Sequence, residues 1–376
     1  MQPRRTKSEY AASGVDYSKI EPFKMAMIAA GRRTLKFPNR RGVVVEADSL
    51  GAHGVVFRYR GGKPHYWCMT QEGLGNKNWI AEWMYQHAGT GRTYYEGIGI
   101  DTALMAANDV ICQGAMPVIY TDEVAAGDSD WFMDERRSRD LAESFYRACR
   151  MCGMALPAGE SPALRYLVRA APPVRSAPSL SGCVTGIIAP RSRMVTGAEL
   201  SVGDRIIGVT SSGIHANGIS LVIKRALTLK DRFLHLLPNG RTLGEEALIP
   251  TRSYVRLVEA LQENDIEIHA LLGGTGGGIS KIAYAKKPFT YRVKRWVEEI
   301  PPLFQFMRET GVSLKNCLTT FNWGIGFYVF VPEKEVERTI RTGKKAGYEL
   351  LEIGQVEAGE RRVIFEPEKI MLPAIE

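Results

Sequence analysis

Asp101, Asn108 and Asp109 lie in the largely apolar stretch Gly99–Pro117. The alanines and other apolar residues there predict a helix that starts near Asp101 and ends before Gly114. Asp101 and Asn108 are seven positions apart and share one helix face, with Asp109 beside them. Their oxygen atoms suit Mg²⁺, which usually keeps phosphate oxygens in its coordination shell. The alternative is that Asp101 caps the helix and Asp109 is solvated.

A second candidate lies at Glu72-Gly-Leu-Gly-Asn-Lys77, after a strand-like run at 66–69. Glycines at 73 and 75 would let backbone N–H groups approach phosphate oxygens, and Lys77 would add positive charge. The spacing is not that of a Walker A loop, and a hairpin turn is the alternative.

Two more acids follow short apolar strands. Asp122 comes just after the predicted strand 118–120, and Glu160 follows the predicted strand 155–158. Acids just past a strand end often face a site, so both are candidate site residues.

The second half of the chain contains a strand (204–210), a Ser/Gly loop (211–218) and a helix beginning at Ile219. This order is typical of anion binding, because free N–H groups and the helix dipole point at the ligand. The loop includes His215, for which a structural role and a ligand contact are both open. The glycine-rich segment 273–278 either approaches a ligand or forms a tight turn.

Composition limits the class of protein. A chain of 376 residues with 45% hydrophobic and 24% charged residues suggests two globular domains. No apolar run approaches the length of a membrane span, and the polar start does not resemble a signal peptide, so we expect a cytoplasmic protein without a membrane partner. We place an N-terminal arm at 1–42, one domain at 43–190 and another at 200–376.

The net charge of +8 is spread over separated basic pairs without a recognition motif. We therefore expect no nucleic-acid partner. The excess positive charge suits an enzyme that attracts phosphorylated metabolites. The six cysteines are scattered, and the pair Cys149 and Cys152 fits core packing better than zinc or redox chemistry.

Taken together, the motifs are more specific than any one of them. They occur in order as Gly99-Ile-Asp-x-x-x-Met-x-x-Asn-Asp109, Gln113-Gly-Ala115, Gly159-Glu160, Ser211-Ser-Gly-x-His-x-Asn-Gly218, Pro250-Thr-Arg-x-Tyr-Val255, Thr275-Gly-Gly-Gly278 and Thr320-Phe-Asn-x-Gly-x-Gly326. This series resembles the aminoimidazole ribonucleotide synthetases, the phosphoribosylformylglycinamidine cyclo-ligases of purine biosynthesis. The resemblance spans residues 10 to 366.

The resemblance implies a two-domain α/β (α+β) protein that forms a homodimer, with the N-terminal domains pairing into a shared β-barrel. It also implies that ATP and Mg²⁺ bind by the acidic N-terminal domain. ATP would phosphorylate the formyl oxygen of formylglycinamidine ribonucleotide, and ring closure would release ADP and phosphate. Phosphoryl transfer depends mainly on positioning and charge neutralisation, which such a site supplies.

Site residues follow from the same resemblance, position by position. Metal ligands would be Asp101, Asp122 and Glu160. The nucleotide or phosphate would contact Glu72, Gly73, Gly75, Lys77, Asn108, Asp109, Ser212, Gly213 and Asn322. Catalytic or substrate-holding roles would fall to Asp101, His215 and Asn217.

The chain departs from the family pattern at several positions. Glu72 stands where the family usually has aspartate, Ala163 where it has a second acid, Gly273 where histidine is common and Trp323 where it has cysteine; Ile28 replaces an expected lysine, with Lys24 one turn away. Two alternatives therefore stay open. One is a divergent ATP-using relative, as selenophosphate synthetases and thiamine-phosphate kinases are, and the other is a non-catalytic dimeric ligand-binding protein.

Overall fold

The computed structural model describes residues 9–375, so residues 1–8 of the predicted arm lie outside the described part. The chain divides into two compact units. The first unit contains the residues up to Gly61, Gln71–Ala103 and Val118–Val184, and the second contains Gly62–Thr70, Leu104–Pro117 and the residues from Thr185 onward. Among the residues described, every helix is too short or too polar to cross a membrane.

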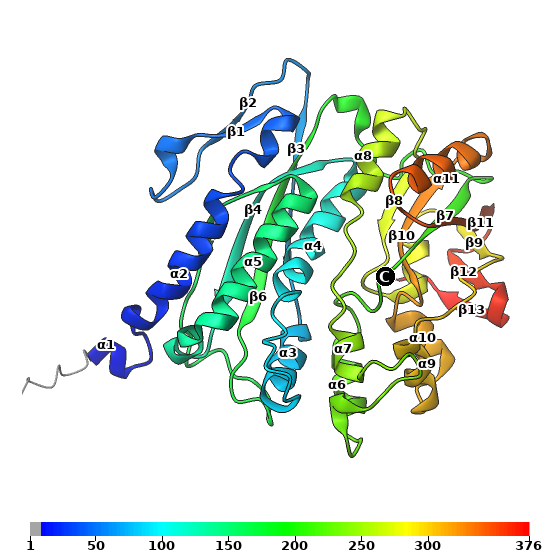
Figure 1. The fold of residues 1–376 in the computed structure, drawn as a ribbon. Coiled ribbons are helices and arrows are strands. Elements are labelled where there is room, and N and C mark those ends of the chain that lie inside the picture. The colour runs from blue at the N-terminus through cyan, green and yellow to red at the C-terminus, as the bar shows by residue number, and fades with distance from the viewer. Residues whose placement is uncertain (1–8, 376) are drawn as a thin grey trace, which may run out of the picture. The chain divides into compact units, whose positions relative to one another are not determined.

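The described part of the first unit contains four α-helices that lie wholly within it. Their bounds are α1 (Glu9–Ala12), α2 (Tyr17–Arg32), α3 (Lys77–His87) and α5 (Glu135–Cys152). Of these helices, α2 and α5 pack on each other. The side chain of Asp16 caps α2 by accepting a hydrogen bond from the Ser18 N–H. Ile20, Phe23 and Met27 of α2 recur at helical spacing and are buried, and α2 lies beside α5 (Figure 1).

A four-stranded sheet has the order β3-β6-β4-β5. Its strands are β3 (Tyr66–Gly73), β4 (Met116–Ala125), β5 (Ala155–Glu160) and β6 (Ser179–Ile188). β4 and β5 run parallel, with Asp122 opposite Gly159 and Glu123 opposite Glu160. A separate antiparallel hairpin pairs β1 (Val43–Val45) with β2 (Phe57–Tyr59).

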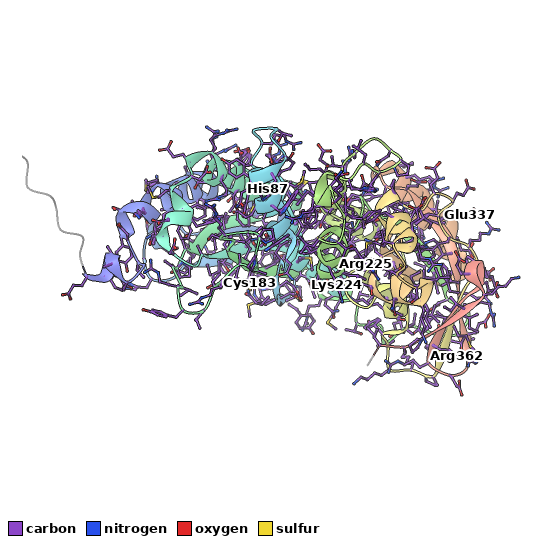
Figure 2. The ribbon with its side chains drawn as sticks, turned by 90° about the horizontal axis from the view of Figure 1, so that it is seen from below. His87, Cys183, Lys224, Arg225, Glu337 and Arg362 are labelled. Atoms are coloured by element: carbon purple, nitrogen blue, oxygen red, sulfur yellow. The ribbon has the colours of Figure 1, made fainter. Side chains whose placement is uncertain are left out.

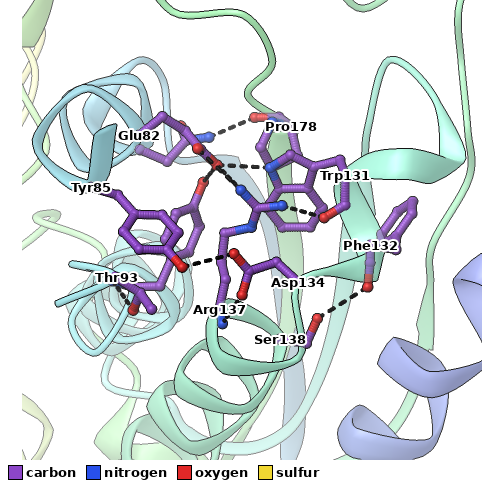
Figure 3. A network of polar contacts seen from close by, with 11 residues as sticks. Glu82, Tyr85, Thr93, Trp131, Phe132, Asp134, Arg137, Ser138 and Pro178 are labelled. Carbon is purple, nitrogen blue, oxygen red and sulfur yellow. Dashed lines mark hydrogen bonds and ion pairs between the residues drawn. The ribbon is translucent and has the colours of Figure 1, made fainter. Parts of the chain in front are cut away.

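A buried polar network fixes the position of α3 (Figure 3). One carboxylate oxygen of Glu82 accepts hydrogen bonds from the hydroxyl of Tyr95 at 2.7 Å, the indole of Trp131 at 2.7 Å and the guanidinium of Arg137 at 3.1 Å. Burial raises the pKa of Glu82, and the charge of Arg137 opposes that rise. The amide of Asn78 also donates to the Pro178 carbonyl at 2.7 Å. These contacts hold the first turns of α3 in one place.

The second unit is built on a seven-stranded sheet of order β13-β12-β9-β11-β7-β10-β8. The strands are β7 (Arg205–Thr210), β8 (Ala270–Gly273), β9 (Phe289–Val293), β10 (Ile325–Val331), β11 (Leu350–Ala358), β12 (Arg362–Phe365) and β13 (Ile370–Pro373). Every residue of β10 is buried, and β10 pairs antiparallel with both β7 and β8. The loops that begin or end at β7 and β10 are therefore neighbours.

Six helices accompany this sheet among the residues described: α6 (Ile219–Ala226), α7 (Leu243–Ala247), α8 (Val255–Glu263), α9 (Pro302–Glu309), α10 (Leu314–Thr320) and α11 (Val336–Lys345). α11 packs on β7, β11 and α8. Figure 2 shows Lys224 and Arg225 of α6 well separated from Arg362 of β12, in keeping with the predicted spread of basic charge. Cys149 and Cys152 are fully buried on α5, which confirms their predicted packing role.

The predicted helix after Gly99 is confirmed as α4 (Ile98–Val110), which continues into a 3₁₀ turn at Ile111–Gln113. The chain then reverses at Gly114, whose φ of 75° favours glycine. The glycine run 273–278 leads directly into a 3₁₀ helix at Gly278–Ala283.

Candidate active site

In the first unit, the segment 72–77 connects strand β3 to helix α3. β3 ends at Gly73, Gly75 adopts a φ of 72°, and α3 begins at Lys77. Gly73 and Gly75 are exposed, and a Cβ built on Gly75 would meet no atom within 4 Å. The glycines therefore leave backbone accessible at the start of a helix, as a phosphate-binding loop requires.

Lys77 and Asp101 form an ion pair in the interior of the first unit. Lys77 Nζ lies 2.8 Å from Asp101 Oδ1, and both side chains are 0% exposed. Burial lowers the pKa of Lys77, whereas the charge of Asp101 acts in the opposite direction. The structure thus pairs a predicted phosphate ligand with a predicted metal ligand. Neither charge faces solvent in this arrangement.

Asp122 and Glu160 lie on the parallel strands β4 and β5. Asp122 was expected just beyond a strand end, but β4 continues to Ala125 and Asp122 lies inside it. Asp122 is 7% exposed, and its Oδ1 occupies the space where a side chain at Gly159 would lie. Burial raises the pKa of Asp122 to about 7, and the charges of Glu160 and Glu123 add to the rise.

This electrostatic setting fits a cation. A buried carboxyl that resists ionisation beside two further acids becomes easier to ionise when a positive ion binds. Asp122 and Glu160 are the residues that would hold Mg²⁺. The described residues contain no group of three or more His, Cys, Asp or Glu side chains arranged for a metal ion, so Asp101 is not gathered with this pair.

In the second unit, the loop 211–218 follows β7 and leads into α6, which confirms the predicted strand, loop and helix. Its side chains are engaged in the fold. The hydroxyl of Ser212 donates to the Pro250 carbonyl at 2.7 Å, and the amide of Asn217 donates to the Thr320 carbonyl at 3.0 Å. Gly213 has a φ of 147°, which favours glycine.

His215 is 1% exposed and its backbone is left-handed, with a φ of 60°. Its Nε2 accepts a hydrogen bond from the Ser212 N–H at 3.4 Å, and its ring packs near that of Tyr254. A Cβ built on Gly326 would overlap both His215 and Tyr254. Tyr254 and Gly326 belong to motifs noted in the sequence, yet their packing against His215 was not predicted.

Asn108 serves the architecture of the second unit. Its Nδ2 donates to the Arg252 carbonyl at 2.9 Å, and its Oδ1 accepts from the Tyr254 N–H at 3.0 Å. Asp109 is partly buried, which raises its pKa, while Lys281 opposes the rise. A Cβ at Gly273 would lie 3.3 Å from the Asp109 carboxylate, so even the first atom of the histidine that is common here in the family would be in tight contact with this acid.

Asn322 is buried and hydrogen-bonded between two loops of the second unit. Its Nδ2 donates to the Gly213 carbonyl at 2.8 Å, and its Oδ1 accepts from the Ser211 hydroxyl at 3.1 Å and from the Gly324 N–H at 2.9 Å. The structure therefore brings Asn322 together with the loop that carries Ser212, Gly213 and His215.

Both units of the chain match the domain models of one protein family. Residues 33–188 match the N-terminal domain of the AIR synthase related proteins, and residues 201–366 match their C-terminal domain. The chain belongs to this AIR synthase related family.

Individual relatives support this family assignment. The chain is 33% identical over 361 residues to a phosphoribosylformylglycinamidine cyclo-ligase of Pyrococcus horikoshii, which covers 96% of each chain. A protein of the same name from Thermococcus gammatolerans is 33% identical and covers 92% of this chain and 95% of the relative. The crystal structure of thiamine-monophosphate kinase from Stenotrophomonas maltophilia shares the fold, with a TM-score of 0.58, 16% identity and coverage of 92% and 97%.

Proposed function

We propose that this protein is an ATP-dependent phosphoribosylformylglycinamidine cyclo-ligase of purine biosynthesis. The observation that carries this proposal is the match to the Pyrococcus horikoshii cyclo-ligase, which extends over 96% of both chains. The two predicted backbone features of such a site, a glycine loop at the start of α3 and a Ser/Gly loop at the start of α6, support it.

The reaction joins a phosphoryl transfer to a ring closure. The formyl oxygen of the substrate attacks the γ-phosphorus of ATP, so that an O–P bond forms and ADP leaves. A substrate nitrogen then attacks the activated carbon and loses a proton, the C–N bond forms, and the C–O bond breaks to release phosphate. Activation is needed because an amide oxygen is a poor leaving group and a phosphate ester is a good one.

Each set of residues has a part in this scheme. Backbone N–H groups at Gly73–Gly75 would bind nucleotide phosphates, with Lys77 and Glu72 beside them. Asp122 and Glu160 would hold Mg²⁺, which neutralises phosphate charge when bound. Ser212, Gly213, His215 and Asn217 would orient the ribotide substrate, since accurate positioning accounts for much of such catalysis. Asp101 would contribute indirectly, by holding the ammonium group of Lys77 in place.

We also propose a homodimer in which the N-terminal domains share a β-barrel. β3 is an edge strand of its sheet, and its Trp67 and Met69 are exposed. Exposed apolar side chains on a sheet edge are a liability unless another chain covers them. Sedimentation of the purified protein tests this, because Met69→Glu should shift a dimer toward monomer.

We also keep as proposals the domain limits 43–190 and 200–376 and a cytoplasmic location.

The decisive experiment incubates the purified protein with formylglycinamidine ribonucleotide, ATP and Mg²⁺, and measures aminoimidazole ribonucleotide and ADP together. We expect both products in equal amounts. ATP hydrolysis without the imidazole would favour the divergent ATP-using enzyme. Binding of ligand with no turnover would favour the non-catalytic alternative.

A further inference from the structure

Two residues other than glycine hold left-handed backbone conformations in the loops around Asn322. His215 has a φ of 60° and Trp323 a φ of 53°. Such a conformation places Cβ close to the carbonyl oxygen and costs about 1–2 kcal/mol for an L-residue. Strained residues persist only where their surroundings hold them, and they concentrate at functional sites.

The side chain of Asn322 supplies this restraint. It is 2% exposed and comes from the loop before β10, whereas its partners Ser211 and Gly213 lie in the loop after β7. Its Nδ2 donates a hydrogen bond to the Gly213 carbonyl in the loop that carries His215. Its Oδ1 accepts from Ser211 and, within its own loop, from the Gly324 N–H. A backbone bond from the Ser211 N–H to the Gly324 carbonyl at 2.9 Å completes the connection.

These bonds leave Asn322 with little capacity for a ligand. A primary amide offers two N–H donors and one carbonyl oxygen with two lone pairs. Both lone pairs of Oδ1 and one donor of Nδ2 are already used inside the protein. A buried amide whose hydrogen-bonding groups are occupied in this way fixes backbone geometry and does not bind a substrate.

The imidazole of His215 depends on the backbone that Asn322 fixes. The Ser212 N–H, which lies between the two partners of Asn322 in sequence, donates to His215 Nε2 at 3.4 Å. This bond requires Nε2 to be unprotonated, so the neutral ring carries its proton on Nδ1. On the other side, the absence of a side chain at Gly326 lets the ring lie against β10.

We infer that Asn322 is a positioning residue that acts through His215, and not a ligand of the nucleotide as its motif suggested. The inference rests on the proposed function, because it assigns His215 to substrate orientation. Loss of Asn322 would release the loop 211–218 from its left-handed turn and misplace the imidazole.

A double-mutant cycle tests whether Asn322 acts through His215. In the wild-type background, Asn322→Ala should raise KM for the ribotide about tenfold, because the His215 imidazole would no longer be held in position to contact the substrate. In a His215→Ala background the same change should raise KM less than about twofold, because the contact it supports is already gone. Equal effects in both backgrounds would overturn the inference and make Asn322 an independent ligand.

Two variants separate positioning from general stability. Gln262→Leu removes a similar buried bond, in which Nε2 donates to the Gly114 carbonyl at 2.8 Å, and should leave KM unchanged. Ser211→Ala removes one of the three Asn322 bonds and should raise KM less than Asn322→Ala does. If Asn322→Ala does not fold, a Ser211→Ala variant with wild-type KM and loop protection would count against the inference.

The inference and the proposed function can fail separately. If the wild-type protein makes no aminoimidazole product, the proposed function falls. Amide hydrogen exchange and the imidazole ¹⁵N shifts of His215 then decide the inference. Asn322→Ala should speed exchange at 211–218 and shift the His215 nitrogens, whereas Gln262→Leu should do neither. An unchanged His215 spectrum in Asn322→Ala would overturn the positioning role.

Discussion

Breaking the buried pair of Lys77 and Asp101 should cost stability and activity by separable routes. Asp101→Asn keeps the size of the side chain and removes its charge. Lys77, whose amino group is 2.8 Å away and 0% exposed, would then be a buried cation without its counter-ion. Removing one partner of a buried ion pair costs about 3–5 kcal/mol, because the remaining charge stays desolvated.

The same ion pair sets the expected loss of unfolding free energy for two related variants. Lys77→Met should cost a similar amount, since it leaves the Asp101 carboxylate buried without the ammonium group. The double variant Lys77→Met/Asp101→Leu replaces both charges with apolar groups, and should cost less than about 2 kcal/mol. The coupling energy of this cycle would be at least about 4 kcal/mol. Each single variant should lower Tm by about 6–20 °C for a unit of this size.

Urea unfolding and ATP turnover of the same preparations give the two readouts. Glu143→Gln is the control, because it breaks the exposed pair with Arg33 in the same unit and should cost less than about 1 kcal/mol. We expect the double variant to be folded and inactive. Wild-type turnover in the double variant would remove both residues from the chemistry. Single variants that cost no more than Glu143→Gln would refute the reasoning on desolvation.

Three further predictions follow from individual contacts. His269 bonds to Asp204 at 2.9 Å and to Glu267 at 3.2 Å; partial burial lowers its pKa, but these bonds outweigh it and raise the pKa above 6.5. The stability from His269 should therefore be complete below pH 6.5 and be lost as the pH rises through the folded-state pKa, and His269→Ala should abolish that slope in pH-dependent urea unfolding. Gly326→Ala should lower the free energy of unfolding by about 1–3 kcal/mol, because its methyl would overlap His215; an unchanged value in a urea titration would contradict this. Asp122→Asn should weaken Mn²⁺ binding about tenfold or more as measured by electron paramagnetic resonance, and equal affinity would exclude Asp122 as a ligand.

Local patterns predicted the elements that carry the candidate residues. The apolar run after Gly99 predicted α4, and the order of strand, Ser/Gly loop and helix predicted β7, the loop and α6. These segments are decided by hydrophobic periodicity and by glycine at turns, which a single sequence displays directly. The family was also correctly identified, because its motifs occur in order along most of the chain.

Contacts between residues far apart in the chain could not be predicted from the sequence. Lys77 and Asp101 are 24 positions apart, and nothing local shows that one would neutralise the other. Asp122 was expected after a strand because the apolar run stops at Tyr120, yet β4 continues through polar residues to Ala125. A strand inside a sheet is extended by backbone pairing with its neighbour, here β5, and not by its own side chains alone.

The family departure at Trp323 can be understood from the hydrogen bonds around Asn322. Trp323 takes part through its backbone, since its carbonyl accepts from the Trp296 indole at 2.8 Å, while its ring stacks on Phe304. The bonds of Asn322 to Gly213, Ser211 and Gly324 use no atom of the Trp323 side chain. A larger residue at 323 therefore changes the packing behind the loop and leaves these bonds in place. If Asn322 positions the neighbouring loop as inferred above, such a change is compatible with the same chemistry, and the departure does not by itself favour another reaction.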